Sequence, residues 1–430
     1  MACFTTVLVP PVAAGPLPDP VAEFPALDMR SVQLGRLLFY DPILSGNRSV
    51  SCATCHHPHF ATSDGVSLGL GDGGIGLGPK RQQDPQNPPE QRIPRNSPAL
   101  FNLGATEFTR FFHDGRLEVD PSRPSGIRTP MGREMEEGFK SALAAQAMFP
   151  VLSADEMAGH YSENEIAQAV RQGFITGEAG AWARLSARVE AIAPYRQAFS
   201  ELQGTAAPIT FADIANVIAD FIAFEWRADQ SAFDKYLRDG TALPPLAAAG
   251  MELFYGKAGC DSCHSGLFQT DHGFHAIAIP QIGPGKAARF ERHNRDLGRM
   301  RVTGEAADAY RFRTPSLRNV TATAPYGHSG AYSSLEDVVR HHLNPISALS
   351  AYSVEQARLP DPGFANDTAL MQDPGEVSAI AAANELVPLN LSDQEVQQIL
   401  SFLESLKDAQ SLAGRLGSPD AVPSGLPVDQ

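Results

Sequence analysis

The sequence lacks a long apolar run and has few basic residues. No hydrophobic stretch reaches the about 18 residues that a helix needs to span a bilayer, so we expect no transmembrane segment. Lysine and arginine number 34 against 49 aspartate and glutamate residues, which gives a formal net charge of −15. Because nucleic-acid binding requires clustered basic side chains, this balance argues against DNA and RNA as partners. Basic or polar protein partners suit the charge better.

Strand-like alternation is also scarce, and short repeats of the solenoid kind are absent. The chain contains 37 glycines and 34 prolines, so much of it is expected to be loop, including residues 65–98 and 115–138. Helical spacing of apolar residues follows three capping patterns, which begin at Thr210, Ser334 and Ser392. We therefore predict a mainly α fold with long irregular loops.

Cysteine is rare, but its distribution carries the strongest signal. Four of the five cysteines fall into two Cys-x-x-Cys-His units, one in each half of the chain. Covalent attachment of haem requires two thiols that add to its vinyl groups and an imidazole directly after them that reaches the iron. We predict two covalently bound haem c groups, with His56 and His264 as proximal iron ligands. The attachment residues are Cys52, Cys55 and His56 in the first unit, and Cys260, Cys263 and His264 in the second.

Two other interpretations of a Cys-x-x-Cys pair fit less well. A zinc site would require the two pairs to meet across the chain, and it leaves the trailing histidines unexplained. A thioredoxin-like redox site would need a βαβ context, which the pattern does not offer. Covalent haem c is normally attached outside the cytoplasm, so we predict a periplasmic protein.

The start of the chain does not show a complete export signal. Residues 1–15 are apolar but have no basic segment before them, so the signal lies upstream or has been removed. The fifth cysteine, Cys3, belongs to neither unit. It is either an incidental cysteine or the lipidated cysteine of a truncated lipoprotein signal.

Further signatures lie in five stretches of the sequence. They are RNSPALFN (95–102), FFHDGR (111–116), QAMFPVLSADEM (146–157), DLGRMRVTGEAADAYRFRTPSLRNV (296–320) and TAPYGHSGAYSSLEDVVRHH (323–342). Together they resemble the bacterial di-haem cytochrome c peroxidase family, which includes the MauG-type enzymes. The resemblance follows the family's order of motifs from about Gln33 to Leu406. It implies two tandem cytochrome c-like haem domains.

The segment TALPP at 241–245 is the best candidate for a boundary between these domains. We expect an N-terminal extension over residues 1–27 and an N-terminal, peroxidatic haem domain over residues 28–240. A C-terminal, electron-transfer haem domain follows over residues 241–410, and the remaining residues 411–430 should form a flexible tail.

The resemblance implies a peroxide-binding pocket over the N-terminal haem. The family's carboxylate there corresponds to Glu156, with Gln146 and Pro150 lining the same pocket. A carboxylate at this place can move a proton from the inner to the outer peroxide oxygen, which allows water to leave. Two alternatives stay open: Glu156 is a solvated acid at a helix start, or Glu134 of the PMGREM segment takes the role, although it precedes Gln146 instead of following it.

For the C-terminal haem, the family supplies a second axial ligand fourteen residues after the position of His328. Ordinary members have methionine there and MauG-type members have tyrosine, whereas this chain has His342. A bis-histidine iron should be low-spin with a lower potential than a histidine/methionine iron. His341 is the adjacent alternative, about 100° away on the same helix. Both could instead be surface histidines favoured by the helix dipole.

Two further departures from the family concern the region between the haems and the first distal face. His113 stands where ordinary members have the tryptophan that relays electrons; Trp182 and Trp226 lie elsewhere and are expected to be core or surface residues. The glycine-rich loop after the first haem has no histidine at the matching place, and His57 and His59 are too close to the attachment site to replace it. We therefore expect a five-coordinate N-terminal haem that needs no reductive activation.

The family also binds one calcium ion between its domains, through an asparagine side chain and two backbone carbonyls. The corresponding positions are Asn96, Thr323 and Pro325, and a sparse set of oxygen ligands completed by water suits calcium. This site rests on the resemblance alone.

Three functions are compatible with these signatures. The first is a peroxidase that reduces hydrogen peroxide to water with electrons from a small cytochrome c or cupredoxin. The second is a MauG-type oxidase that uses peroxide to modify a tryptophan or tyrosine of a partner protein. The third is a simple electron carrier, against which Glu156 and the open N-terminal haem argue. Both a monomer and a homodimer remain compatible with the sequence.

Overall fold

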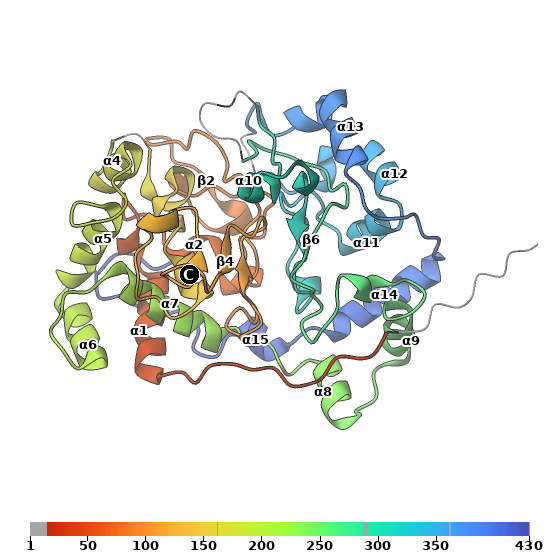
Figure 1. The fold of residues 1–430 in the computed structure, drawn as a ribbon, viewed down its shortest axis with the longest axis horizontal. Helices are drawn as coiled ribbons and strands as arrows, with labels where there is room; N and C mark the ends of the chain where they lie inside the picture. Colours follow the sequence, from red (N-terminus) through yellow and green to blue (C-terminus); the bar gives the residue numbers. More distant parts are fainter. Residues whose placement is uncertain (1–14, 161, 287–290, 292, 361–362, 430) are drawn as a thin grey trace, which may run out of the picture.

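The computed structural model describes residues 15–160, 162–286, 291, 293–360 and 363–429. Cys3 and most of the apolar start therefore lie outside the described residues. The described chain is built from helices joined by long loops; helices α1 and α4–α7 lie on one side of the molecule and helices α9 and α11–α14 on the other (Figure 1). This confirms the predicted mainly α fold. Among the helices described, none is both long enough and apolar enough to cross a bilayer.

The N-terminal half contains eight helices within the described range and most of the strands. The helices are α1 (Met29–Tyr40), α2 (Cys52–Cys55), α3 (Ala142–Ala147), α4 (Glu165–Gln172), α5 (Ala181–Glu190), α6 (Ala193–Gln203), α7 (Phe211–Glu225) and α8 (Ala232–Asp239). The strands are β1 (Gly74–Ile75), β2 (Gln82–Gln83), β3 (Arg110–Phe111), β4 (Leu117–Val119) and β5 (Ile127–Arg128). They pair antiparallel as β1–β2 and β3–β4–β5.

The C-terminal half has the same character. Its described helices are α9 (Pro245–Phe254), α10 (Met300–Thr303), α11 (Leu335–Leu343), α12 (Pro345–Ser350), α13 (Pro374–Ala382), α14 (Asp393–Ser405) and α15 (Ala409–Ala413). Strands β6 (Phe274–His275) and β7 (Phe312–Arg313) pair antiparallel. The three helices predicted from capping patterns are confirmed as α7, α11 and α14.

Each half is built around a close crossing of two helices. In the N-terminal half α1 crosses α7 at Gly35, where an added Cβ would stand 1.8 Å from the carbonyl oxygen of Val217. In the C-terminal half α9 crosses α14 at Gly250, where a Cβ would stand 1.9 Å from the carbonyl oxygen of Gln398. Only glycine permits such backbone approach. The buried apolar residues accordingly form one core around α1 and α7 and a second around α9 and α14.

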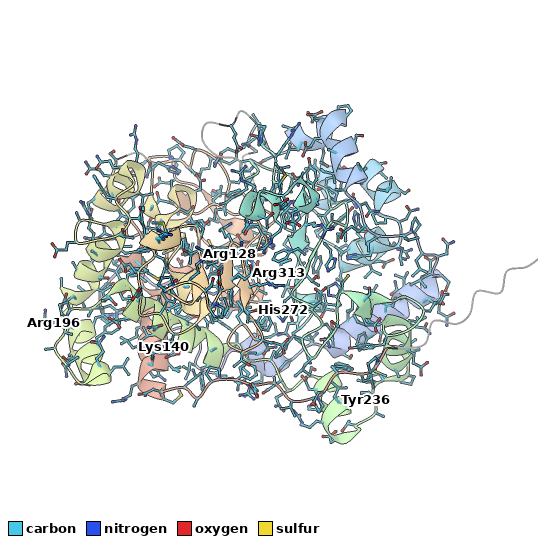
Figure 2. All side chains as sticks on the ribbon, viewed as in Figure 1. Arg128, Lys140, Arg196, Tyr236, His272 and Arg313 are labelled. Carbon is cyan, nitrogen blue, oxygen red and sulfur yellow. The ribbon has the colours of Figure 1, made fainter. Side chains whose placement is uncertain are left out.

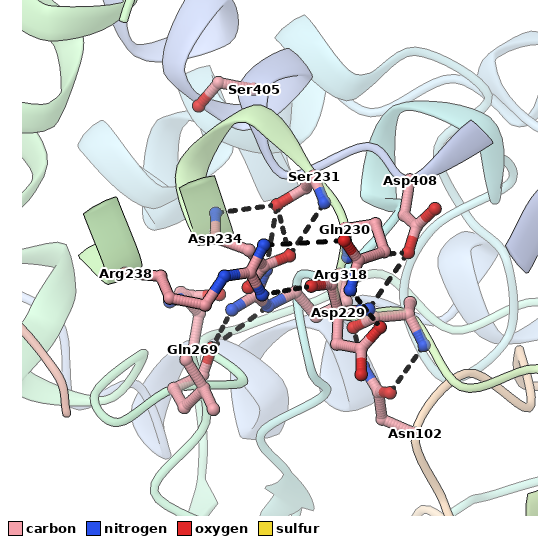
Figure 3. Close-up of polar contacts among 12 residues, drawn as sticks. Asn102, Asp229, Gln230, Ser231, Asp234, Arg238, Gln269, Arg318, Ser405 and Asp408 are labelled. Carbon is pink, nitrogen blue, oxygen red and sulfur yellow. Dashed lines mark hydrogen bonds and ion pairs between the residues drawn. The ribbon is translucent and has the colours of Figure 1, made fainter. Parts of the chain in front are cut away.

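The predicted domain boundary differs from the packing at α8. Phe233 of α8 is fully buried in the second core, although the prediction assigned residues up to 240 to the first domain. Asp234 forms a buried ion pair with Arg318 at 2.8 Å, and Asp408 accepts hydrogen bonds from the amides of Asp229 and Gln230 (Figure 3). By these contacts α8 belongs with the C-terminal half, because its apolar face is covered there.

The tail is the clearest correction to the sequence-based expectation. Residues 411–429 were predicted to be flexible, but they pack along the N-terminal half. Val422 is buried in the first core, and the amide of Leu416 donates to the carboxylate of Glu225 at 2.7 Å. Thr54, inside the first haem motif, donates a hydrogen bond to Asp429. The polar, proline-containing composition conceals these anchors, which exist only through contacts with distant residues.

Candidate functional site

The first Cys-x-x-Cys-His unit forms a short helix that presents its histidine. Helix α2 begins after a capping box between Ser51 and Thr54, and its two cysteines form no disulfide. Nδ1 of His56 lies 2.9 Å from the carbonyl oxygen of Thr62. A nitrogen that faces a carbonyl must carry the proton, so Nε2 of His56 keeps its lone pair. A metal-binding imidazole needs this tautomer.

The second unit repeats the arrangement. Cys260 and Cys263 flank a 3₁₀ turn and also form no disulfide, and Nδ1 of His264 lies 2.9 Å from the carbonyl oxygen of Gln269. Burial lowers the pKa of His264 to about 4 and also lowers that of His56, so both imidazoles are neutral at pH 7. Both units therefore supply the donor set that a covalently attached haem requires.

His342 faces His264 across a gap of the right size for one metal atom. Their ring centroids are 6.5 Å apart, and Nδ1 of His342 lies 2.8 Å from the carbonyl oxygen of Val338, which leaves its Nε2 free. Two imidazoles that bind one metal from opposite sides at about 2.0 Å have centroids about 6 Å apart. The geometry fits a haem iron held by both histidines.

His341, the adjacent alternative, has no nitrogen to spare. Its Nδ1 lies 2.9 Å from the hydroxyl of Tyr332, and its Nε2 lies 2.7 Å from the carbonyl oxygen of Ile277. The side chain is fully buried, so it is not a surface histidine at a helix end either. Of the two candidates, the structure thus favours His342 as the ligand, which stays a prediction.

Glu156 lies in a π-helical turn (Ala154–Ala158) that packs against the glycine-rich loop. The amide of Asp72 donates to the carbonyl oxygen of Glu156 at 3.0 Å. Burial raises the pKa of the Glu156 carboxyl above its usual value, although Lys286 and Arg116 nearby favour the charged form. A carboxyl with a raised pKa holds its proton more readily than an exposed glutamate does, which suits an acid–base group.

Gln146 and Pro150 lie just before this turn. Gln146 is in the last turn of α3, and its Oε1 is buried without a hydrogen-bond partner among the described atoms. A buried acceptor of this kind is normally satisfied by a water or ligand. Pro150 begins a 3₁₀ turn that leads into the turn of Glu156. The rival candidate, Glu134, is exposed on another 3₁₀ turn and therefore does not belong to a buried pocket.

The glycine-rich segment is mainly loop, as predicted, and it is held in place by hydrogen bonds. The guanidinium of Arg81 donates to three of its carbonyl oxygens: Leu70 at 2.6 Å, Gly71 at 2.7 Å and Gly76 at 2.7 Å. Strands β1 and β2 close the loop as a short hairpin. The loop thus forms a fixed support under the turn that carries Glu156.

His57 and His59 remain beside the attachment site, as expected. The amide of His59 donates to Nδ1 of His57 at 3.2 Å, and the two rings are 4.7 Å apart. His57 is fully buried in this arrangement. The two histidines therefore stabilise the turn after the first motif.

His113 lies where the two halves meet. Its Nε2 is 3.0 Å from the carbonyl oxygen of Asn96, and its own carbonyl oxygen accepts a hydrogen bond from the amide of Arg313, which lies at the centre of the molecule (Figure 2). Burial, together with the charge of Arg95, lowers the pKa of His113 to about 4. The two tryptophans are fully buried core residues, Trp182 and Trp226.

A buried ion network at this junction was not identified from the sequence. Arg95 binds Asp114 of its own half and Asp296 of the other half, each at 2.7 Å. Burial alone would raise the pKa of Asp114, but Arg95 and Arg116 lower it to about 2. All three residues lie inside the family stretches quoted above. The sequence alone, however, does not show that Arg95 pairs with the two aspartates.

Arg313 is a further candidate functional residue that the sequence did not identify. Its guanidinium contacts the carbonyl oxygens of Phe112 at 3.3 Å and Thr314 at 3.2 Å, and burial lowers its pKa to about 10. A buried cation held by carbonyl groups is stabilised by an added carboxylate. A haem propionate would supply one, so Arg313 fits the predicted cofactors.

The predicted calcium ligands are brought to the same region. Asn96 donates its amide to the carbonyl oxygen of His328 at 2.9 Å, which ties it to the segment that contains Thr323 and Pro325. Its Nδ2 donates to the carbonyl oxygens of Val66 and Ser67. The side-chain oxygen is then the atom that can face a cation. These three positions stay a prediction.

One further set of possible metal ligands overlaps a haem motif. Ligand atoms of Cys263, Asp271 and His275 lie within 4.8 Å of one another. The thiol of Cys263 belongs to the second attachment unit, however, and His275 already contacts Asp271 at 2.8 Å. We therefore assign this set to the surroundings of the second haem motif and not to a separate ion.

Two helical halves, each with a Cys-x-x-Cys-His unit that presents a neutral imidazole, define a di-haem c-type cytochrome. Comparison with known proteins agrees with this class. Residues 29–242 match the sequence profile described as di-haem cytochrome c peroxidase. The chain belongs to this family of oxidoreductases, whose members bind two covalently attached haem c groups.

Similar proteins include both named branches of the family. The methylamine utilization protein MauG of Methylorubrum extorquens is 28% identical over 394 residues, which covers 91% of this chain and 81% of the relative. Cytochrome c551 peroxidase of Pseudomonas aeruginosa is 29% identical over 327 residues, with 75% of each chain covered. A MauG-like protein associated with microbial copper homeostasis is similar in structure, with a TM-score of 0.59 and 25% identity over 96% of this chain and 97% of that protein. The diheme peroxidase BthA of Burkholderia thailandensis shares the fold, with a TM-score of 0.57 and 20% identity over 99% of this chain and all of that protein.

Proposed function

We propose that this protein reduces hydrogen peroxide to water at its N-terminal haem, with electrons that a small periplasmic donor protein delivers through the C-terminal haem. The observation that carries this proposal is the raised pKa of the Glu156 carboxyl in a turn that packs against the glycine-rich loop. Gln146, ten residues earlier in the chain, adds a buried amide oxygen without a hydrogen-bond partner among the described atoms. When bound, the haem supplies the iron that binds peroxide and the electrons that reduce it.

Side chains of the protein then transfer the proton and orient the peroxide. Glu156 accepts the proton of the inner peroxide oxygen and returns it to the outer oxygen, so that water can leave. Gln146 orients peroxide or the water product through its side-chain amide. The charges of Arg116 and Lys286 favour the ionised form of Glu156, which the first proton transfer requires.

The two haems have different tasks in this proposal. His264 and His342 would hold the C-terminal haem, which would supply electron transfer. His56 would hold the N-terminal haem, which would supply the iron for peroxide, and the loop held by Arg81 would support the turn of Glu156. His113 lies on the route between them, where its backbone and ring join Asn96 to Arg313.

Replacement of Glu156 tests the proposal. Glu156→Gln keeps the size of the side chain but removes proton transfer, and it should slow peroxide reduction by on the order of 10²–10⁴. Glu134→Gln is the matched control, since Glu134 is the exposed glutamate of the same Glu-Met type. An unchanged rate in Glu156→Gln, or an equal loss in the control, would contradict the assignment.

A MauG-type oxidation of a partner protein is the alternative. The MauG relative, 28% identical over 91% of this chain, supports it, and the cytochrome-c peroxidase IdrP2 of Pseudomonas sp., 26% identical over 95% of this chain, supports the peroxidase. Turnover with a reduced small cytochrome c or cupredoxin separates the two functions. Rapid oxidation of the donor by peroxide supports the peroxidase; negligible donor oxidation with covalent change in a partner protein supports the alternative.

The calcium site can be examined separately. We infer that one calcium ion binds Oδ1 of Asn96 and the carbonyl oxygens of Thr323 and Pro325, completed by water. Metal analysis of the purified holoprotein should find one calcium per chain, and Asn96→Ala should lower this content. A calcium-free holoprotein that keeps full activity would rule the site out.

A further inference from the structure

A row of aromatic rings leads away from the proposed ligand of the C-terminal haem. The ring of His341 lies 6.2 Å from that of His342 on α11, and the ring of Tyr332 lies 5.4 Å from that of His341. Tyr352 meets Tyr332 edge-on at 5.6 Å. Neighbouring rings are thus in contact from the predicted iron ligand to the outer part of the C-terminal half.

The hydrogen bonds of His341 give it one defined tautomer. Its Nε2 lies 2.7 Å from the carbonyl oxygen of Ile277, which can only accept, so the proton is on Nε2. Nδ1 must then accept the hydrogen bond from the Tyr332 hydroxyl, at 2.9 Å. Tyr332 is only 2% exposed, so its phenol has a fixed base beside it in place of water.

Tyr352 provides a natural contrast. It touches the same tyrosine, but its hydroxyl donates to the carbonyl oxygen of Ala331 at 3.0 Å. A backbone carbonyl accepts a hydrogen bond but cannot take the proton, whereas an imidazole nitrogen can. Loss of an electron from a tyrosine requires its proton to leave, so Tyr332 is the tyrosine of this pair that is prepared for oxidation.

The row of rings ends at a cavity. Its volume is about 270 Å³, and its lining includes the side chains of Tyr332, His341, Asp337, Arg340, Asn344 and Gln356. This is room for a molecule with a single aromatic ring, somewhat below the usual size of a drug-binding pocket. The carboxylate of Asp337 can accept a hydrogen bond from a hydroxyl group, and the edge of the Tyr332 ring borders the cavity.

We propose that Tyr332 and His341 form a redox relay that connects the C-terminal haem to this cavity, where a small phenol is oxidised. The relay rests on the proposed peroxide reaction, which supplies the oxidising equivalents. It extends that function by a second electron source that needs no donor protein.

Each step balances. Tyr332 gives one electron towards the C-terminal haem, and its O–H proton moves along the hydrogen bond to Nδ1 of His341. A phenol in the cavity returns one electron to Tyr332, and the proton moves back from His341 to the Tyr332 oxygen. The phenol gives its own O–H proton to water, from which the peroxide reaction takes up protons, and it leaves as a phenoxyl radical. Two phenols thereby supply the two electrons and two protons that convert one hydrogen peroxide into two waters.

The relay predicts a radical on one tyrosine. Holoprotein treated with peroxide in the absence of any donor should give the electron paramagnetic resonance signal of a tyrosyl radical. Tyr332→Phe should lose this signal, whereas Tyr352→Phe, the matched control, should keep it. Persistence of the signal in Tyr332→Phe, or its loss only in Tyr352→Phe, would overturn the relay.

A second test uses the unaltered protein, so its result does not depend on whether the variants fold. A nitroso spin trap added with peroxide should be found by peptide mass spectrometry on Tyr332, and an adduct confined to other residues would overturn the proposal. Peroxide loss is recorded in the same samples. Peroxide consumed without a Tyr332 adduct contradicts the relay alone, whereas no peroxide consumption contradicts the peroxidase function on which it rests.

The cavity is tested with guaiacol as the phenol. Guaiacol should quench the Tyr332 radical and be oxidised in proportion to peroxide. Ala348→Leu narrows the cavity and should raise the KM for guaiacol while the radical yield without guaiacol stays the same. A radical that guaiacol fails to quench, or an unaltered KM in Ala348→Leu, would overturn the assignment of the cavity to phenols.

Discussion

The backbone of Gly71 lies directly against that of Glu156. A Cβ added to Gly71 would stand 2.6 Å from the carbonyl oxygen of Glu156 and 2.7 Å from its Cα, closer than side-chain carbons approach one another. The glycine-rich loop and the π-helical turn are therefore in backbone contact, and the position of the proposed acid–base group depends on the absence of a side chain at residue 71.

Gly71→Ala should consequently move Glu156 away from its place. Because a displacement of about 1 Å can reduce a catalysed rate by about 10²-fold, we expect peroxide reduction to fall by one to two orders of magnitude while haem content is kept. Stopped-flow kinetics with peroxide measure the change. Gly363→Ala is the control, since among the described residues its Cβ meets only the carboxylate of Asp367, at an ordinary 3.7 Å.

The raised pKa of Glu156 predicts the pH dependence of the reaction. Proton acceptance requires the carboxylate, and burial keeps the carboxyl protonated to a higher pH than an exposed glutamate, whose pKa is about 4.3. The rate of the peroxide reaction should therefore rise with pH through a pKa above that value and fall off on the acid side. In Glu156→Gln the rate should no longer fall on the acid side. If it still falls, another group is responsible for the pH dependence.

Replacement of His342 should change the C-terminal haem and leave the other haem unaltered. In His342→Ala we expect one low-spin signal in the electron paramagnetic resonance spectrum to become high-spin, because the imidazole on the second face is lost. His341→Gln is the comparison, since both nitrogens of His341 are engaged elsewhere. A low-spin signal that survives His342→Ala would place the ligand at another residue.

Arg95 should be essential for the packing of the N-terminal half against the C-terminal half. Arg95→Ala leaves Asp114 and Asp296 buried without their cation, which typically lowers the free energy of unfolding by about 3–5 kcal/mol. Denaturant unfolding of the holoprotein measures this change. Arg123→Ala, which removes an exposed pair with Asp120, should change the same free energy by less than about 1 kcal/mol.

The same network predicts a loss of stability in acid. Arg95 and Arg116 hold the pKa of Asp114 at about 2 in the folded protein, below the about 3.9 of an unfolded chain. The stabilisation is therefore complete above about pH 4 and is lost as the pH falls towards about 2. In Arg95→Ala this acid transition should be weaker; an unchanged pH dependence would mean that other carboxylates dominate it.

The sequence by itself determined the chemistry that local spacing encodes. The two Cys-x-x-Cys-His units, the capped helices that begin at Phe211, Leu335 and Asp393, and the mainly α class all follow from residues within one turn or one helix of each other. The choice of His342 as a candidate ligand came from a count along the chain, and only the structure separated it from His341, through the hydrogen bonds that occupy both nitrogens of the latter.

Tertiary structure decided what depends on residues far apart in the chain. The tail was expected to be flexible, because its composition gives no sign that Glu225 binds the amide of Leu416. The backbone contact of Gly71 with Glu156 and the pairing of Arg95 with Asp296 were equally invisible. The physical reason is common to them all: hydrogen bonds and ion pairs form between groups within a few ångströms, and a single sequence states the identity of those groups but not which distant partners the fold brings to them.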